Sequence, residues 1–338
     1  MTYHHQVARE KGGPEVLDWL EFEPGPPQAG YAAIRVEAAG VLLADVLWQL
    51  GIAPVGPKPP FTPGYDLVGV IEATGPGVNG VKRGQRVAAM IQYGGYTEHA
   101  VVPVAKIVPV PEGVNPTLAA AATTSYLTAH MLVHNVGKLG VGDVLLVHGA
   151  GGGTGSAILD VARLAGVKVY GTASRSKHGL VEAKGAFPID YRSEDFVEVL
   201  RAREPRGVDL VVDPIGGDVT KRSLRLLKPK GKLVSTAMVS SIKERKGGLN
   251  VLLAMMRLPL WSLGHPGRRA FFWDVVAAAK KDEARYRSDL ATVFDLLKEE
   301  RLSPDIGRVM PMRDAPEAQR LLLDYAVQGK IVLVPGPI

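Results

Sequence analysis

Seven residues between two apolar segments carry the strongest chemical signal in the sequence. The largely apolar run Val144–His148 is followed directly by Gly149-Ala150-Gly151-Gly152-Gly153-Thr154-Gly155. We expect a strand, a glycine-rich turn and a helix starting after Gly153. Such a turn lets backbone amides approach a diphosphate, and the helix N-terminus adds partial positive charge. The predicted binding residues are Gly149, Gly152, Gly153, Thr154 and Gly155.

The glycine spacing alone does not settle the ligand. Gly149-x-x-Gly152-x-x-Gly155 departs from the pattern G-x-G-x-x-G, and a tight strand–helix turn without a ligand is the alternative interpretation. About 20 residues further on, NAD-binding sites place a carboxylate for the ribose 2′-hydroxyl. Here the segment 171–177 has none, and it contains Ser174, Arg175 and Lys177. Cations suit a 2′-phosphate, so we predict NADPH; the alternative is that they are solvated loop charges.

The elements that must position these residues change in type near residue 117. Before it, short apolar runs separated by Gly and Pro turns predict strands at Ala32–Ala38, Leu67–Ala73, Arg86–Ile91 and Glu98–Pro103. After it, a predicted helix at Thr117–Asn135 leads into alternating strands and helices. The strands are expected at Val144–His148, Val167–Thr172, Pro188–Asp190, Val208–Asp213 and Gly231–Thr236. This alternation predicts an α/β fold whose doubly wound parallel sheet is covered on both faces.

The last third of the chain is less regular. Ala270–Val275 is predicted as a further strand, Asp289–Glu300 and Ala315–Gln328 as helices, and residues 329–334 as a closing strand. Between them, Lys243–Arg269 combines basic residues with the apolar stretch Leu249–Leu263. Three interpretations stay open, in falling order of preference: a wall for a bulky hydrophobic substrate, a dimer contact, and a membrane-surface element.

Composition excludes several classes of chemistry. The chain of 338 residues contains no cysteine, so thiolate nucleophiles, disulfides and cysteine metal sites are ruled out. The net charge is +6, but the basic residues are dispersed and no recognition motif accompanies them, so no nucleic-acid partner is expected. The first residues lack the apolar stretch of a secretory signal, and we expect a cytoplasmic protein.

Several short motifs resemble the zinc-free quinone oxidoreductase (zeta-crystallin-like) branch of the medium-chain dehydrogenases/reductases. The resemblance covers nearly the whole chain. Its markers are Ala38-Ala39-Gly40-Val41 with Asp45, Pro63-Gly64-Tyr65-Asp66-Leu67-Val68-Gly69, Gly84-Gln85-Arg86-Val87, Gly94-Gly95-Tyr96-Thr97-Glu98, Ser125-Tyr126-Leu127-Thr128-Ala129, the glycine-rich turn and Gly329-Lys330-Ile331-Val332-Leu333.

The resemblance implies two domains and a cofactor. A GroES-like β-rich catalytic domain would comprise residues 1–120 and 276–338, with the C-terminal tail returning to it, and a Rossmann NADPH-binding domain would comprise residues 121–275. A homodimer is usual in this branch. By matching position, Lys177 and Tyr191 would contact the 2′-phosphate, and Thr128 would lie on the nicotinamide side.

Metal ligands of the zinc-dependent relatives are replaced in this sequence. Those relatives carry Cys at the position of Leu42 and Gly-His-Glu where this chain has Gly64-Tyr65-Asp66. A catalytic zinc needs three protein ligands, so we predict no metal. His130 and His134 share a helix face, but no glutamate follows as in zincins, and we expect them to be structural.

The proton donor is left open by two further departures. The branch usually has Asn where Leu42 stands, and enoyl-reducing members often have Tyr at the position of Ala53. Tyr65 could supply the proton, or it could be an aromatic filling the space of the lost metal site. Asp45 and Asp66 could simply orient loops and cap backbone amides.

These observations predict an NADPH-dependent, zinc-independent reductase. It would transfer hydride to a small hydrophobic electrophile, an α,β-unsaturated carbonyl or a quinone, with Tyr65 and Thr128 as candidate hydrogen-bond donors. The alternative is a nucleotide-binding protein on a reductase scaffold that binds lipid or a partner and turns over little. A metal-free alcohol dehydrogenase is a weaker third option.

Overall fold

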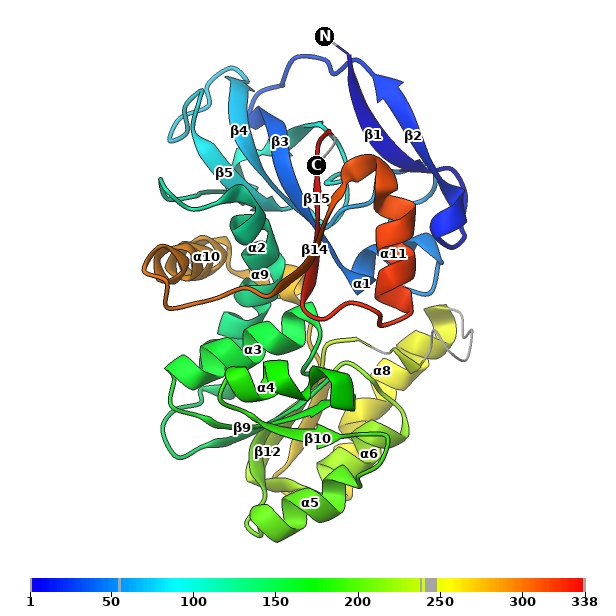
Figure 1. Ribbon diagram of the computed structural model, residues 1–338, viewed down its shortest axis with the longest axis vertical. Coiled ribbons are helices and arrows are strands. Elements are labelled where there is room, and N and C mark those ends of the chain that lie inside the picture. The colour runs from blue at the N-terminus through cyan, green and yellow to red at the C-terminus, as the bar shows by residue number, and fades with distance from the viewer. Residues whose placement is uncertain (1, 54–55, 238, 241–247, 337–338) are drawn as a thin grey trace. The chain divides into compact units, whose positions relative to one another are not determined.

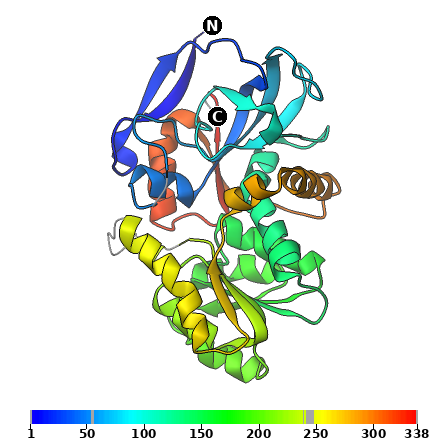
Figure 2. The same ribbon diagram turned by 180° about the vertical axis from the view of Figure 1, so that it is seen from behind.

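The described part of the chain divides into two compact units. The computed structural model describes residues 2–53, 56–237, 239–240 and 248–336. One unit comprises Met1–Leu127 and Ala278–Ile338, and the other comprises Thr128–Ala277. Figures 1 and 2 show a β-rich first unit and a second unit with a sheet between helices. The expected architecture, a β-rich domain plus a domain with a parallel sheet, is therefore confirmed.

The first unit is built on a seven-stranded sheet and a two-stranded one. The large sheet has the order β14-β15-β3-β4-β5-β7, with β6 also paired to β3, and β1 pairs with β2. The strands are β1 (Tyr3–Ala8), β2 (Leu17–Phe22), β3 (Tyr31–Val41), β4 (Asp66–Thr74), β5 (Arg86–Met90), β6 (His99–Pro103), β7 (Ile107–Pro109), β14 (Ile306–Pro311) and β15 (Lys330–Val334). The helices are α1 (Leu43–Gln49), α2 (Pro116–His130), α10 (Glu283–Lys298) and α11 (Ala315–Leu323).

The C-terminal strand returns to the first unit, as the resemblance implied. β15 runs antiparallel to β3, with Ile331 opposite Val41 and Leu333 opposite Ala39. The side chains of Ile331 and Leu333 are buried in the apolar core of this unit. Burying these aliphatic side chains stabilises the pairing, so segments about 290 residues apart in the sequence are joined.

The second unit contains a six-stranded parallel sheet. Its order is β10-β9-β8-β11-β12-β13, which in chain order is 3-2-1-4-5-6, the arrangement of dinucleotide-binding sheets. The strands are β8 (Val144–His148), β9 (Lys168–Ala173), β10 (Phe187–Asp190), β11 (Val208–Asp213), β12 (Leu227–Ser235) and β13 (Arg269–Phe272). The helices are α3 (Gly153–Leu164), α4 (His178–Ala183), α5 (Phe196–Arg203), α6 (Asp218–Leu224) and α8 (Gly248–Leu263), and α9 (Val275–Lys281) leads out of the unit.

Strands β8 and β11 are buried along nearly their whole length, which is why the sequence shows them as continuous apolar runs. All five side chains of β8 are buried, as are five of the six in β11. A strand covered by helices on both faces needs continuous Val and Leu rather than alternation. The strand order reverses direction at β8, between β9 and β11, and open α/β sheets bind ligands at the carboxyl ends of strands at such a point.

Three of the predicted boundaries that are wrong have an identifiable local cause, either a capping side chain or a left-handed residue. β13 ends at Phe272 and not at Val275, because Asp274 accepts a hydrogen bond from the Ala277 amide and starts α9. Helix α10 begins at Glu283 and not at Asp289, because Asp282 accepts a hydrogen bond from the Arg285 amide. Helix α11 ends at Leu323 and not at Gln328, because Tyr325 adopts a left-handed conformation, with φ of 54°.

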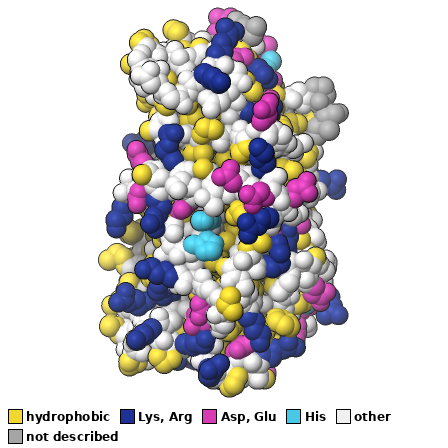
Figure 3. All heavy atoms as spheres, turned by 90° about the vertical axis from the view of Figure 1, so that its left-hand side faces the viewer, with side chains coloured by type: hydrophobic (Ala, Val, Ile, Leu, Met, Phe, Trp, Pro, Cys, Tyr) yellow, Lys and Arg dark blue, Asp and Glu magenta, His cyan; other side chains and the backbone are white. Residues whose placement is uncertain are grey.

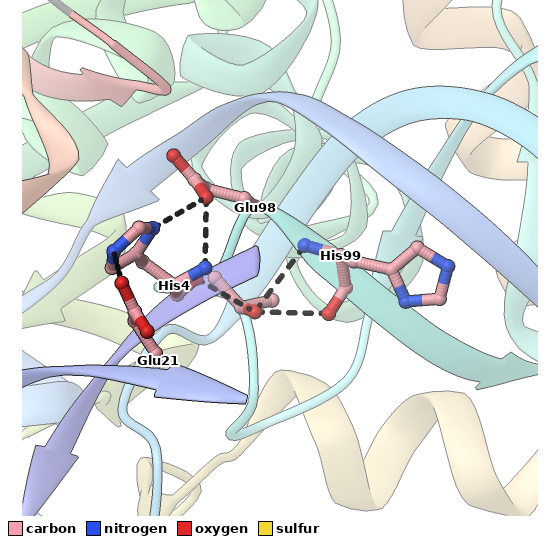
Figure 4. A network of polar contacts seen from close by, with 5 residues as sticks. His4, Glu21, Glu98 and His99 are labelled. Carbon is pink, nitrogen blue, oxygen red and sulfur yellow. Dashed lines mark hydrogen bonds and ion pairs between the residues drawn. The ribbon is translucent and has the colours of Figure 1, made fainter. Parts of the chain in front are cut away.

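A polar network fixes β1 to the sheet of the first unit, and it was not predicted (Figure 4). His4 lies between two glutamates, its Nδ1 3.2 Å from Glu98 Oε2 and its Nε2 3.4 Å from Glu21 Oε1. The amide of His4 also donates to Glu98 Oε2, at 2.8 Å. The Thr97 hydroxyl donates to the carbonyl of His99. The contacts between His4 and Glu98, 94 residues apart, join β1 to the residue just before β6, which is a structural role.

The surface carries mixed charge. On the face shown in Figure 3, Lys and Arg side chains are scattered among acidic and apolar ones rather than joined into one basic area. In the part of the chain that the structure describes, no helix combines the length and the apolar character needed to cross a membrane.

Candidate functional site

The turn after β8 has the geometry of a phosphate cradle. Gly149 has φ of 70°, a left-handed conformation that favours glycine. Gly152 is the N-cap residue of α3, and the first turn of that helix holds no acidic residue. A Cβ atom on Gly155 would lie 2.2 Å from the Gly149 carbonyl oxygen, so no side chain fits there. The backbone amides at the start of a helix lack intrahelical partners, and here the first turn has no carboxylate that would repel an anion.

Lys177 reaches this turn from the next strand connection. A Cβ atom on Gly151 would lie 2.7 Å from Lys177 Cδ, so the lysine stem lies directly against the glycine backbone. Lys177 is half-buried, and burial lowers the pKa of its ammonium group. An anion beside it would favour the charged form. The structure therefore brings together the predicted turn and the predicted 2′-phosphate contact.

The remaining predicted cofactor residues lie on the same edge of the sheet. β10 pairs with β9 so that Asp190 is opposite Ala173, and the residues that follow, Tyr191 and Ser174, leave at the same carboxyl edge. The Oγ of Ser174 is 3.2 Å from the Oγ of Ser176. Arg175 is exposed, and Tyr191 is 55% exposed, so both side chains are accessible to a ligand.

Arg192 is a further cation that sequence reasoning missed. Its guanidinium lies 5.7 Å from the centre of the Tyr191 ring. The neighbouring carboxylate of Asp190 is already engaged, because it accepts hydrogen bonds from the Arg192 amide and the Ser193 hydroxyl. These hydrogen bonds lower the pKa of Asp190. Arg192 lies 15 residues beyond Lys177 in the sequence, so sequence proximity does not connect the two. The register of β9 with β10 is the structural signal that identifies Arg192.

Two buried polar residues at the carboxyl ends of β8 and β11 support the glycine turn. The ring of His148 bridges two hydroxyls, with Nδ1 3.0 Å from Thr172 Oγ1 and Nε2 2.9 Å from Ser223 Oγ. Burial lowers the pKa of His148, which keeps the ring neutral. At the end of β11, Asp213 accepts hydrogen bonds from the amides of Ile215 and Gly216. Both groups hold the carboxyl edge of the sheet in place.

Tyr65, the first catalytic candidate, is packed among aromatic rings in the first unit. It is 4% exposed, and its ring centre is 5.5 Å from that of Trp48. Trp48 in turn lies 6.3 Å from Tyr93, which is half exposed. The backbone is fixed as well, because the Tyr65 carbonyl accepts hydrogen bonds from the amides of Ile91 and Gln92. Packing of this kind holds an aromatic side chain in one orientation.

Buried charges lie next to Tyr65 along the chain. Asp66 is fully buried and accepts hydrogen bonds from the amides of Gly40 and Thr124. A Cβ atom on Gly40 would lie 2.7 Å from Asp66 Oδ1 and 3.0 Å from Lys330 Nζ, so the two charges share one small space. Burial raises the pKa of Asp66 and lowers that of Lys330, and their mutual attraction opposes both shifts.

Asp45 completes this buried group. Its Oδ2 accepts hydrogen bonds from the Leu42 amide, at 2.9 Å, and from the Tyr96 hydroxyl, at 2.8 Å. Burial raises the pKa of Asp45 to about 7. The expectation that Asp45 and Asp66 cap backbone amides is confirmed.

Thr128, the second catalytic candidate, belongs to the other unit. It is 7% exposed and lies near the end of α2, where the second unit begins. His130 and His134, which follow it, have ring centres 4.6 Å apart. Among the described residues, no group of three or more His, Asp or Glu side chains is arranged to hold a metal ion.

The geometry agrees with comparisons to known proteins. Residues 28–112 match the alcohol dehydrogenase GroES-like domain, and residues 184–333 match the family described as zinc-binding dehydrogenase. The chain is 34% identical to the synaptic vesicle membrane protein VAT-1 homolog of Rattus norvegicus, over 93% of this chain and 79% of that protein. It is 28% identical to a 2-haloacrylate reductase from Burkholderia, over 97% of this chain and 98% of the reductase.

Solved structures show the same fold over nearly the full length. A quinone oxidoreductase from Pseudomonas syringae superposes with a TM-score of 0.88 at 28% identity, covering 98% of this chain and 100% of that one. A mycobacterial protein complexed with NADPH superposes with a TM-score of 0.87 at 27% identity, with the same coverage. The chain belongs to the medium-chain dehydrogenase/reductase family, in its zinc-free, quinone oxidoreductase-like branch.

Proposed function

We propose that this protein is an NADPH-dependent reductase that transfers hydride, without a metal, to an α,β-unsaturated carbonyl or a quinone. The observation that carries the proposal is the joint placement of the glycine turn and Lys177, with no carboxylate between Gly171 and Lys177. Bound NADPH would supply a hydride equivalent from its nicotinamide. The mycobacterial relative solved with NADPH and the reductase from Burkholderia support this assignment.

The residues of the second unit fit the cofactor, and each would have a distinct role. Backbone amides around Gly152, Gly153, Thr154 and Gly155 would hold the diphosphate, with Gly149 allowing the turn. Ser174, Arg175, Lys177 and Tyr191 would surround the 2′-phosphate, where ammonium and guanidinium groups form charge-assisted hydrogen bonds. Thr128 would orient the nicotinamide side. The fit rests on Gly151 and Gly155, where an added Cβ would collide with the Lys177 stem and with the backbone of the turn, respectively.

Tyr65 is the proposed proton donor for the second half of the reaction. Reduction of a polarised C=C bond adds hydride at the β-carbon and a proton at the α-carbon, and the intermediate carries negative charge on oxygen. A hydroxyl held in one orientation can stabilise that charge and deliver the proton. The rings of Trp48 and Tyr93 beside Tyr65 favour an apolar substrate.

A steady-state assay of NADPH oxidation across enones and quinones tests the proposal. Turnover with at least one class is expected. Changing Tyr65 to Phe keeps the packing and removes the hydroxyl, so kcat should fall at least about tenfold while KM changes little. An unchanged kcat would assign Tyr65 to packing alone. The matched control is Tyr93→Phe, which alters an exposed hydroxyl of the same aromatic cluster and should leave kcat near that of the wild type.

A second candidate function is a nucleotide-binding protein that binds lipid or a partner and turns over little. The name of the rat relative and the exposed apolar residues of α8 favour it. Tight NADPH binding without turnover on any substrate of the panel would support it. For either function, we propose a cytoplasmic homodimer, on the basis of family membership; light scattering of the purified protein tests the dimer.

A further inference from the structure

Helix α8 presents an unusual apolar surface. Six of the 13 large hydrophobic side chains that are exposed among the described residues lie on this one helix. They are Leu249, Leu252, Leu253, Met256, Leu260 and Leu263, with exposed fractions between 42% and 78%. At about 100° per residue they occupy an arc of about 100°, and at about 1.5 Å per residue they extend over about 21 Å. This set is called the α8 stripe below.

The opposite side of α8 attaches the helix to its own unit. Val251 and Leu258, seven residues apart, are buried, and the Ser262 hydroxyl accepts a hydrogen bond from the Ala270 amide at 2.7 Å. Ala270 belongs to β13, the edge strand of the six-stranded sheet. The helix therefore covers part of that edge, which is a common protection against strand pairing. By helical geometry the α8 stripe lies on the side opposite Val251 and Leu258, and helix α8 itself lies at the margin of its unit in Figures 1 and 2.

The charged residues from the start of α8 to the end of β13 have one sign. Arg257 is the only charged residue within α8, and no acidic residue occurs from Gly248 to Trp273. Arg257 is exposed at one border of the stripe, Arg269 is exposed at the start of β13, and the Lys221 ammonium lies 5.2 Å from the ring centre of Trp261. The basic residues from Lys243 to Lys246 lie outside the described residues.

This combination favours one kind of partner. In a two-fold contact with a second copy, the patch would meet itself, and residues 248–273 offer no carboxylate to pair with Arg257 or Arg269. A surface of anionic lipids, in contrast, offers phosphate groups that attract the cations and an acyl boundary in which the leucines can be buried. Helices that lie in a membrane surface pair an apolar face with flanking Lys or Arg in this way.

We propose that the α8 stripe docks on an anionic lipid surface. Leu252, Met256 and Leu260 enter the boundary between headgroups and acyl chains, and Arg257 contacts lipid phosphate. The contact is peripheral and reversible, because a single helix face supplies it. The proposal does not depend on the reductase activity, since none of these residues belongs to the cofactor site.

Co-sedimentation of the full-length protein with vesicles tests the inference. Phosphatidylcholine vesicles are compared with vesicles in which about a third of the lipid is phosphatidylglycerol, at low and high salt. The wild type should bind the anionic vesicles, less at high salt, and the neutral ones at least about tenfold more weakly. The double variant Met256→Glu/Leu260→Glu should lose at least about tenfold in affinity, because carboxylates replace two inserting side chains.

Two controls keep the result interpretable. The double variant Val141→Glu/Val309→Glu adds the same charge at exposed hydrophobic sites away from α8 and should lose less affinity than the α8 variant. NADPH affinity, measured on both variants, should match the wild type and so show that the fold is intact. The proposal is overturned if the wild type binds neither vesicle, or if both double variants bind equally. It is also overturned if the α8 variant only converts a dimer to a monomer, which would assign the stripe to a second copy.

Discussion

Asp45 carries a carboxyl group that is buried away from solvent. Asp45 is 1% exposed, and its Oδ2 accepts two hydrogen bonds. Burial outweighs these bonds and raises its pKa to about 7, while Asp66 nearby raises it further and Lys330 lowers it. The residue is thus a proton-binding group inside the first unit, close in sequence to Leu42, where zinc-dependent relatives carry a ligand.

This pKa predicts a pH-dependent stability. The folded state keeps the Asp45 proton up to about pH 7, whereas the unfolded chain releases it near the ordinary value of 3.8. Between these values the free energy of unfolding falls as pH rises, by at most about 1.4 kcal/mol per unit from this group. Asp45→Asn keeps an acceptor oxygen but binds no proton. Its stability relative to the wild type should therefore increase from about pH 4 to about pH 7.

Urea unfolding across this range is the measurement. Glu10→Gln, at an exposed glutamate, is the control, and its difference from the wild type should vary much less with pH. A stability difference between Asp45→Asn and the wild type that did not change with pH would show that Asp45 is ionised throughout.

At the scale of elements, the segment β8–turn–α3 depends on glycines that leave no room for a side chain. Gly155→Ala would place a Cβ 2.2 Å from the Gly149 carbonyl oxygen, so either the turn or the helix must shift. We expect NADPH affinity to fall at least about tenfold and the protein to lose about 2 kcal/mol of stability. Gly179→Ala in α4 is the matched control. No atom lies within 4 Å of its added Cβ, and Ala favours helix.

Fluorescence titration with NADPH and thermal unfolding measure the two effects. If Gly155→Ala bound NADPH as tightly as Gly179→Ala, the turn would not be the diphosphate site.

Sequence periodicity predicted the elements well where burial is continuous. The strands β8, β9 and β11 were found because buried parallel strands need runs of Val and Leu. β1 and β2 were missed, since Tyr3–Ala8 mixes polar residues with apolar ones and its pairing with Leu17–Phe22 is set by tertiary contacts. A strand end was misplaced at Asp274 and helix ends at Asp282 and Tyr325, where capping or a left-handed residue decides the boundary.

Site residues were predictable only where the signal is local. The glycine turn directly follows one predicted strand and Lys177 follows the next, so the sequence alone indicates that both lie near a bound dinucleotide. Arg192 and His148 became visible only through strand register and packing, because their partners lie on other elements. Asp45, Asp66 and Lys330 belong to the sequence motifs, but the space shared by Asp66 and Lys330 depends on β15 returning to β3.

For the whole molecule, the replaced ligands predict metal-independent activity. Leu42 has no donor atom, and Tyr65 stands where zinc-dependent relatives have His. We expect the rate of NADPH oxidation to be unchanged after prolonged treatment with EDTA, and added zinc to give no increase. A large loss with EDTA that zinc reverses would contradict the assignment to the zinc-free branch.

We propose that the turn at residues 149–155 and the cations beyond β9 together select the phosphorylated dinucleotide. The most direct test is calorimetric titration of the wild type and of Lys177→Ala with NADPH and NADH. We expect the wild type to bind NADPH at least about tenfold more tightly than NADH, and Lys177→Ala to lose most of this preference while keeping its NADH affinity. Equal affinities in the wild type, or a preference for NADH, would contradict it.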